Sequence, residues 1–156
     1  MDGRDNDRSG APHSVLFLCG QNAIRSPIAE SLARSLLSPN VFIASAGVRA
    51  GERDPFVDAV LEEAGLPPRK EQTVALEDME DAYFDLIVTL APEAHHAALE
   101  LTRTMAIDVE YWPTPDPSVA AGTRVQIMDA YRDVLTRLKE RIEARFGRKT
   151  AKEPRD

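Results

Sequence analysis

The segment that most constrains the fold, residues 14–37, joins an apolar run to an apolar pattern at helical spacing through a short polar loop. Residues 15–19 form the apolar run, and the helical pattern begins at Ile28. A short apolar run is typical of a buried strand, and apolar residues three and four positions apart are typical of an amphipathic helix. The segment therefore predicts a strand, a loop and a helix in that order.

The loop of this segment, residues 19–26, contains Cys19, the only cysteine of the chain, and Arg25 at the expected start of the helix. No proline interrupts residues 20–26, so each of them offers a backbone N–H group that can bind a tetrahedral oxyanion. The helix N-terminus adds a partial positive charge, and Arg25 can bind the oxyanion through two parallel hydrogen bonds. The candidate substrate-binding residues are Gly20, Gln21, Asn22, Ala23, Ile24 and Ser26.

The position of Cys19 favours a chemical role for its side chain. Cysteine reacts as the thiolate, which forms more readily at a helix N-terminus beside a fixed positive charge. Cys19 has both neighbours, and the hydroxyl of Ser26 can donate a hydrogen bond to the sulfur. A buried structural cysteine at the end of a strand is the alternative, and Cys19 alone would favour it. Together with Arg25 and Ser26, the pattern instead predicts a catalytic nucleophile.

The composition of the chain limits the compartments and the classes of partner that we expect. A single cysteine excludes an internal disulfide and suits a reducing compartment. The net charge of −7 and a pI near 5.0 argue against nucleic acid or an anionic membrane as a partner. No apolar run is long enough to span a bilayer, and residues 1–13 lack the apolar segment of a secretory signal. We expect a cytoplasmic protein that binds an anionic substrate locally.

The rest of the chain alternates between strand and helix patterns. Further strands are expected at residues 41–46, 84–90 and 106–112, and helices at 26–37, 55–64, 92–102 and 123–146, with a short helical segment near 76–82. Residues 14–147 are expected to form one domain, preceded by a flexible N-terminal lead at residues 1–13 and followed by a flexible tail at residues 148–156.

Four strands that alternate with helices predict an α/β fold of three layers, with a four-stranded parallel sheet and helices on both faces. In such sheets the site lies beyond the carboxyl ends of the strands, where neighbouring connections leave for opposite faces. The first strand, which leads into the Cys19 loop, should therefore be central. The strand at residues 106–112 alternates apolar and acidic residues, which is typical of the sheet edge.

The loop after the edge strand carries Asp116 between two prolines, Pro115 and Pro117. Prolines stiffen a loop, and the expected topology brings this one to the same rim as Cys19. Cleavage of a phosphate ester by a thiolate needs an acid to protonate the leaving oxygen and then a base to activate water. Asp116 can serve in both steps, and its choice for them depends on the position of Asp-Pro in the family that the chain resembles. On its own it would be interpreted as a turn aspartate or a helix cap.

Two adjacent histidines, His95 and His96, are the other candidates for chemistry. Neighbouring residues on a helix point about 100° apart, so these two cannot bind one metal ion. We expect both on the surface, and we predict no metal site and no cofactor.

The run V-L-F-L-C-x-x-N-x-x-R-S-P-I-A-E resembles the low-molecular-weight protein tyrosine phosphatases and the arsenate reductases that share their fold. Ser-Ala-Gly at residues 45–47 and Asp-Pro at residues 116–117 follow in the family's order. The resemblance implies a flavodoxin-like, phosphotyrosine protein phosphatase I-like fold with Cys19, Arg25 and Asp116 as catalytic residues. It also implies hydrolysis of a phosphorylated protein or a small phosphomonoester through a phosphocysteine.

The chain departs from the family pattern at four positions. Gln21 replaces a glycine of the loop, and Ile24 replaces its second cysteine. Ser118 and Val119 replace the tyrosines that stack on a phosphotyrosine ring, so the sequence indicates phosphatase chemistry more strongly than tyrosine specificity.

Two alternatives to a phosphatase stay open. An arsenate reductase would need an external low-molecular-weight thiol, because the chain has no second cysteine to attack Cys19. A phosphate-binding module without turnover is the other alternative, and the intact Cys19, Arg25, Ser26 and Asp116 argue against it.

Overall fold

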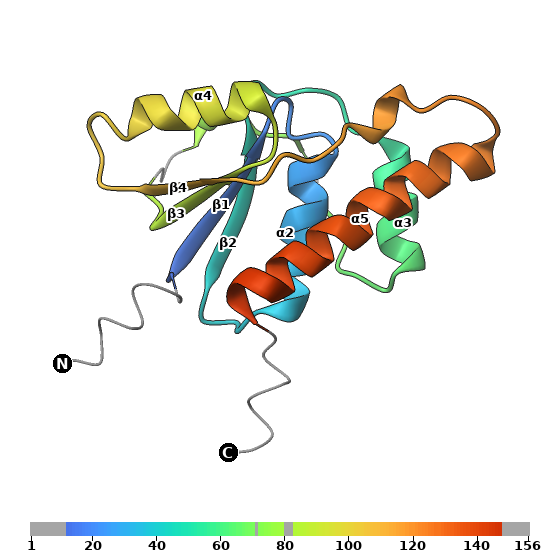
Figure 1. Ribbon diagram of the computed structural model, residues 1–156, viewed down its shortest axis with the longest axis horizontal. Coiled ribbons are helices and arrows are strands. Elements are labelled where there is room, and N and C mark those ends of the chain that lie inside the picture. The colour runs from blue at the N-terminus through green and yellow to red at the C-terminus, as the bar shows by residue number, and fades with distance from the viewer. Residues whose placement is uncertain (1–11, 71, 80–82, 148–156) are drawn as a thin grey trace, which may run out of the picture.

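A four-stranded parallel sheet forms the centre of the fold (Figure 1). The computed structural model describes residues 12–70, 72–79 and 83–147. The strands lie in the order β2-β1-β3-β4, and all three pairings are parallel. Their bounds are Ser14–Cys19 for β1, Phe42–Gly47 for β2, Leu86–Thr89 for β3 and Asp108–Tyr111 for β4. The first strand is thus central and β4 lies at an edge, as the sequence predicted.

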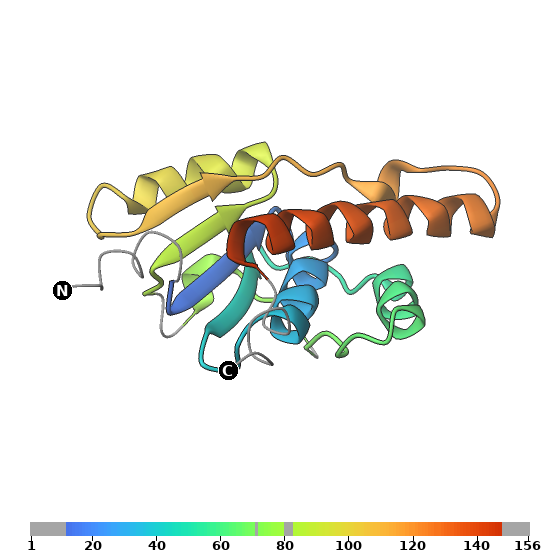
Figure 2. The same cartoon turned by 60° about the horizontal axis from the view of Figure 1, so that its bottom comes forward.

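Helices cover both faces of this sheet, which confirms the predicted three layers (Figures 1 and 2). The helices α2, α3 and α5 lie on one face, and α4 lies on the other. Their bounds are Arg25–Leu36 for α2, Pro55–Glu63 for α3, Pro92–Leu101 for α4 and Arg124–Phe146 for α5. The described residues also form two short 3-10 helices, η1 at Leu76–Asp78 and η2 at Pro117–Val119.

Some sequence expectations fall outside the described residues. The expected lead and tail at residues 1–13 and 148–156 lie there, except for residues 12 and 13. Of the short helical segment expected near residues 76–82, the described part forms only the 3-10 helix η1.

From Val15 to Cys19 the central strand is apolar, because both of its faces are buried. Val15 and Phe17 pack into the core under α2 and α5, whereas Leu16 and Leu18 pack against α4. Successive side chains of a strand point to opposite faces, so a strand covered on both sides has no position for a polar residue. This burial fixes β1 at the centre of the sheet and leaves its carboxyl end, at Cys19, free to turn into the loop.

Local capping signals set the helix starts near the site. The side chain of Asp54 accepts a hydrogen bond from the Phe56 amide at 2.8 Å, with Pro55 at the first helical position of α3. Thr123 and Gln126 form a reciprocal capping box at the start of α5. The two starts lie close together, since the guanidinium of Arg124 in α5 lies 5.4 Å from the Phe56 ring centroid in α3.

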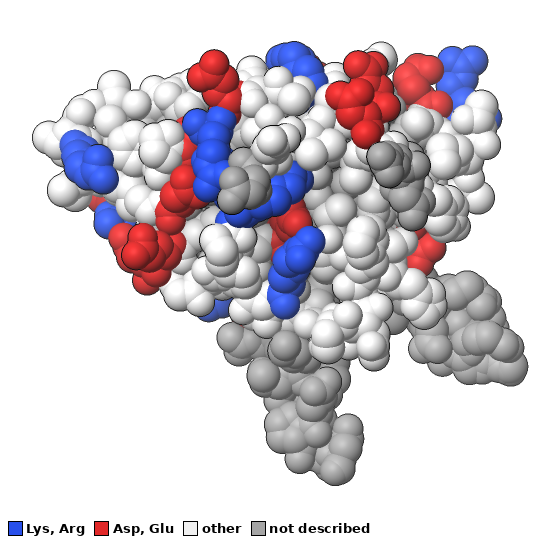
Figure 3. Space-filling model, turned by 180° about the vertical axis from the view of Figure 1, so that it is seen from behind, with Lys and Arg blue, Asp and Glu red and all other residues white. Residues whose placement is uncertain are grey.

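The surface carries both signs of charge. Figure 3 shows Lys and Arg side chains interleaved with Asp and Glu over the face turned away in Figure 1. Ion pairs such as Arg132–Glu63 and Arg49–Glu93, each 2.7 Å long, join opposite charges between separate elements. Within the described ranges, no helix is both long enough and apolar enough to cross a membrane.

Candidate active site

The loop from β1 to α2 is braced along its length by the segment that follows β2. The backbone amides of Val48, Arg49 and Gly51 donate to the carbonyl oxygens of Cys19, Gly20 and Gln21 at 2.9, 3.0 and 2.9 Å. Gly47 makes this approach possible, because a Cβ atom there would lie 2.5 Å from the Asn22 nitrogen. The loop is therefore held through its carbonyl groups.

The backbone N–H groups of the same loop remain available. Among the residues that the structure describes, no acceptor pairs with the N–H groups of residues 20–26. Buried backbone donors are almost always paired in proteins, and a curled run of them at a helix N-terminus suits an anion. Of the predicted loop residues, Gly20, Asn22, Ala23 and Ser26 are buried, Ile24 is half-buried and Gln21 is exposed.

Asn22 fixes the curl of the loop. Its backbone has a positive φ of 58°, in the left-handed region that asparagine adopts more readily than most residues. Its side chain is buried, and Oδ1 accepts a hydrogen bond from the Val74 amide at 2.9 Å. Nδ2 donates to Ser26 Oγ at 2.9 Å and to Ser45 Oγ at 3.0 Å. All of its side-chain hydrogen-bonding capacity thus supports the loop.

The thiol of Cys19 lies beside the hydroxyl of Ser26. The two atoms are 2.9 Å apart, and only 3% of Cys19 is exposed. Ser26 Oγ also lies 3.3 Å from the carbonyl oxygen of Ala46, a second acceptor for its single proton. When the sulfur is ionised, Ser26 can donate to it, and when the sulfur is protonated, Ser26 can turn to Ala46. The hydroxyl therefore accommodates both protonation states.

Arg25 links the Cys19 loop to the segment that precedes Asp116. Its Nη1 donates to the carbonyl oxygen of Thr114 at 2.9 Å. A guanidinium has five N–H donors, so the remaining donors can bind an oxyanion at the rim. The half-buried Arg25 can thus hold the segment and a ligand at the same time.

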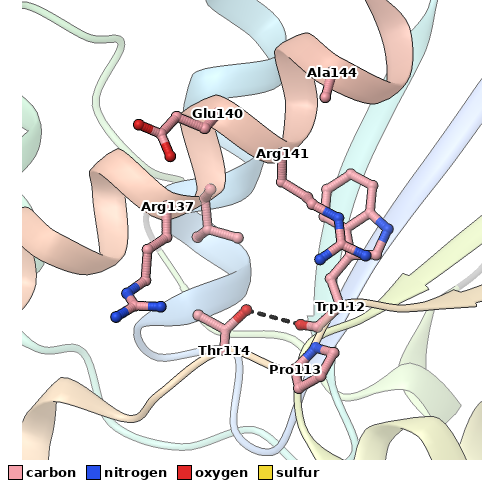
Figure 4. Close-up of a pocket in the computed structure, with 8 residues that line it drawn as sticks. Trp112, Pro113, Thr114, Arg137, Glu140, Arg141 and Ala144 are labelled. Atoms are coloured by element: carbon pink, nitrogen blue, oxygen red, sulfur yellow. Dashed lines mark hydrogen bonds between the residues drawn. The ribbon is translucent and has the colours of Figure 1, made fainter.

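The segment from Trp112 to Thr114 is anchored to the sheet and to α5. The amides of Trp112 and Thr114 donate to the carbonyl oxygens of Thr89 and Leu90 at 2.8 and 3.1 Å. Figure 4 shows the Thr114 hydroxyl donating to the Trp112 carbonyl and Arg141 beside the Trp112 ring, whose centroid lies 5.1 Å from the guanidinium carbon. A hollow of about 300 Å³ separates this segment from the outer side chains of α5. These contacts fix the approach to Asp116.

Asp116 caps the 3-10 helix η2. Its Oδ1 accepts from the Ser118 amide at 2.9 Å and from the Ser118 hydroxyl at 2.7 Å. Within the described part of the chain, Oδ2 accepts no hydrogen bond. The cap role weighed from the sequence is therefore real, and it leaves one carboxylate oxygen available for proton transfer.

An aromatic pair lies near Asp116. Tyr131 donates its hydroxyl proton to Asp54 at 2.7 Å, and its ring lies 5.2 Å from that of Phe56. Burial raises the pKa of the Tyr131 hydroxyl, and the hydrogen bond to Asp54 and the charges of Asp54 and Asp116 raise it further. The guanidinium of Arg124 lies 5.4 Å from the Phe56 ring centroid. Tyr131 and Asp54 are far apart in the sequence, so their contact had no sequence signal.

Three charged residues that sequence reasoning missed contact the Cys19 loop or the residues that hold it. Arg69 is buried and donates to the carbonyl oxygens of Ala23 and Asp54, each at 3.0 Å. Lys70 donates to Ser45, and its partner Glu30 is buried in α2. Two adjacent basic residues, Arg69 and Lys70, follow two prolines in the sequence, and this pair was the only signal for their role. It could not identify their partners, which lie far away in the sequence.

The expectation that both histidines lie on the surface is wrong for His95. His95 is half-buried, its Nδ1 lies 3.0 Å from the Thr89 hydroxyl, and its ring stacks on Tyr111. His96 is exposed. In the described residues, no group of three or more His, Cys, Asp or Glu side chains is arranged to hold a metal ion.

Comparison with known proteins identifies relatives of two kinds. The family described as low molecular weight phosphotyrosine protein phosphatase matches residues 14–153. An arsenate reductase of Bacillus licheniformis is 30% identical over 131 residues, which cover 83% of this chain and 91% of the relative. A low molecular weight protein-tyrosine-phosphatase, PtpB of Staphylococcus epidermidis, is 40% identical over 85 residues, 52% of this chain and 58% of the relative.

A solved structure agrees with these matches. The arsenate reductase of Archaeoglobus fulgidus superposes with a TM-score of 0.65 at 29% identity, and the match covers 83% of this chain and 96% of that chain.

Proposed function

Because the chain belongs to the low molecular weight phosphotyrosine protein phosphatase family, we propose that it is a cysteine-dependent phosphatase that hydrolyses phosphate monoesters through a phosphocysteine. One observation carries this proposal. The loop around Cys19 combines unpaired backbone N–H groups, the Ser26 hydroxyl 2.9 Å from the sulfur and the guanidinium of Arg25 at its rim. This arrangement binds a tetrahedral dianion next to a nucleophile.

In the first step, the Cys19 thiolate attacks the phosphorus atom, and the bond from phosphorus to the leaving oxygen breaks. The loop amides and Arg25 stabilise the negative charge on the equatorial oxygens. Protonated Asp116 gives its proton to the leaving oxygen, so that an alcohol rather than an alkoxide departs. The products of this step are the alcohol, a phosphocysteine and the Asp116 carboxylate.

In the second step, the Asp116 carboxylate accepts a proton from a water molecule as that water attacks the phosphocysteine. The phosphorus–sulfur bond breaks, and the electron pair returns to the Cys19 thiolate. Inorganic phosphate leaves, and Asp116 is protonated again for the next cycle. The Ser26 hydroxyl donates to the sulfur in this step and stabilises the departing thiolate.

A second candidate function is arsenate reduction, because relatives with that name match 83% of the chain. The Cys19 thiolate would displace hydroxide from arsenate, and an external thiol would then attack the Cys19 sulfur. The electron pair of the sulfur–arsenic bond would stay on arsenic, which releases arsenite and leaves a mixed disulfide. A second external thiol would reduce this disulfide. The thiols must be external because the chain has no second cysteine.

One experiment on the purified chain separates these functions. Release of phosphate from p-nitrophenyl phosphate and formation of arsenite from arsenate are measured side by side, each with and without glutathione and glutaredoxin. We expect hydrolysis that needs no thiol beyond the reductant that keeps Cys19 reduced. Arsenite formation that depends on the thiol, without ester hydrolysis, would establish the reductase instead. Phosphate binding with neither activity would show a binding module.

The preferred substrate class is a second expectation about this site. Val119, which is 80% exposed, and the exposed Ser118 flank Asp116, so no aromatic side chain follows the catalytic acid. A stacked ring contributes about 0.5–1.5 kcal/mol beyond its buried area. We therefore expect phosphotyrosine peptides to exceed small aryl phosphates in kcat/KM by less than about tenfold. A preference of several orders of magnitude would implicate Phe56 as the stacking wall, and a Phe56→Leu variant would then lose it.

The compartment and partners follow from the same chemistry. A lone cysteine that must stay reduced supports a reducing, cytoplasmic location for the enzyme. Phosphorylated proteins and small phosphomonoesters are the proposed substrates.

A further inference from the structure

A lysine that the proposed mechanism does not use lies behind the Cys19 loop. Lys70, in the connection after α3, is half-buried, and its Nζ donates to the carbonyl oxygen of Ser45 at 2.6 Å and to Ser45 Oγ at 2.8 Å. Its partner Glu30 lies 3.6 Å away and is itself paired with Arg34 at 2.7 Å. Lys70 and Asn22 also line one small cavity of about 10 Å³, roughly the space of one water molecule.

A continuous chain of hydrogen bonds runs from Lys70 to the Cys19 sulfur. Ser45 Oγ accepts from Lys70 and from Asn22, and it donates its own proton to Glu30 at 2.5 Å. The other N–H of the Asn22 amide donates to Ser26 Oγ, which lies 2.9 Å from the sulfur. Every hydroxyl and amide group on this path is buried. Because Ser45 Oγ accepts from both Lys70 and Asn22, the network holds the ammonium in place and does not relay a proton. In such buried surroundings a charge acts on another charge more strongly than it does in water.

The two ends of this chain also interact through their charges. Burial lowers the pKa of the Lys70 ammonium, whereas the charges of Glu30 and of an ionised Cys19 raise it. Attraction between two groups is mutual, so an ammonium that the thiolate stabilises must stabilise the thiolate in return. Glu30 opposes this effect at Cys19 because its charge has the opposite sign.

The neighbouring basic residues are engaged in other contacts. Arg69 donates to Ala23, Asp54 and Asp58. Arg25, at the rim, donates to the Thr114 carbonyl and is assigned to the substrate. The elements around the Cys19 loop carry these charged groups: Arg25, Glu30 and Arg34 on α2, Asp116 at the start of η2, and Arg69 and Lys70 in the connection after α3.

We propose that Lys70 favours the thiolate form of Cys19 through the charge of its ammonium, which its hydrogen bonds to Ser45 hold behind the Cys19 loop, and that Glu30 limits this effect. The inference rests on the proposed function only in that the nucleophile is a thiolate. It assigns to Lys70, which the proposed mechanism does not use, a part in the chemistry.

The experiment measures the thiolate fraction of Cys19 against pH in three variants. Ultraviolet thiolate absorbance and the rate of iodoacetamide alkylation both report on Cys19 alone, because the chain has one cysteine. On the acid side of the titration, we expect Lys70→Met to reduce the thiolate fraction by about three- to tenfold. We expect Glu30→Gln, which keeps an acceptor for Ser45, to increase it. Lys139→Met, at an exposed lysine of α5, is the control and should change nothing.

A decrease of the thiolate fraction in Lys70→Met together with an increase in Glu30→Gln would exclude a merely structural role. A loosened loop would change the thiolate fraction of both variants in the same direction. Equal decreases in Lys70→Met and Glu30→Gln would therefore overturn the proposal, as would a Lys70→Met curve that overlays the wild type. If Lys70→Met does not fold, Glu30→Gln carries the test, and a lower thiolate fraction in it contradicts the proposal. The titration needs no turnover. A chain that processes neither aryl phosphate nor arsenate would contradict the proposed function, and the changes in the thiolate fraction would still decide the role of Lys70.

Discussion

Replacing Cys19 by serine should abolish turnover of p-nitrophenyl phosphate, with a loss of at least about 10⁴-fold in kcat. A serine hydroxyl at this position has no general base within its own loop to remove its proton. The nearest hydroxyl is that of Ser26, which lies 2.9 Å from the wild-type sulfur and is too weak a base to take the proton. The thiol, in contrast, reacts as an anion that the loop stabilises.

Binding of the anion should survive this substitution. The loop N–H groups and the Arg25 guanidinium are unchanged in Cys19→Ser, so the Kd for inorganic phosphate should change by less than about tenfold. Isothermal titration with phosphate measures this directly, and a thermal melt confirms that the variant folds. Hydrolysis by the serine variant at the wild-type rate would contradict a covalent mechanism on Cys19. Loss of phosphate binding together with turnover would mean that Cys19 supports the loop rather than the chemistry.

The part of the fold around the Cys19 loop could be predicted because its signals are local. The apolar run of β1, the loop without proline and the helical spacing after Ile28 are all readable within one segment, and the structure forms β1 and α2 there. The caps at Asp54 and Thr123 are equally local, since each is formed by residues two or three positions apart. The central place of β1 followed from its burial on both faces.

The supporting contacts of the loop could not be predicted, because they join residues that are distant in sequence. Lys70 lies in a connection without periodicity, and nothing in its own neighbourhood indicates Ser45 or Glu30 as partners. The same holds for Val74, whose amide binds Asn22 across the sheet edge. His95 was misjudged because its partners, Thr89 and Tyr111, belong to two different strands. Such contacts depend on register and packing, which a single sequence does not fix.

Replacing Asp116 by asparagine should lower kcat by roughly 10²- to 10⁴-fold for phenyl phosphate, the range of one general acid and base. Asparagine keeps an oxygen that can accept from Ser118, so the cap of η2 is preserved while the transferable proton is lost. Steady-state rates with a series of aryl phosphates measure the effect. Asp133→Asn, at an exposed carboxylate of α5 paired with Arg137, is the matched control and should retain wild-type rates.

The dependence on the leaving group separates the two roles of Asp116. A nitrophenolate departs with little need for a proton, so Asp116→Asn should still form the phosphocysteine from p-nitrophenyl phosphate. Its hydrolysis still needs a base to activate water, so that intermediate should accumulate. Rapid mixing should then show a burst of about one nitrophenolate per chain followed by slow turnover, and intact-mass analysis should find one phosphate on Cys19. Losses that are equal for all leaving groups, without a burst, would mean that Asp116 only caps η2.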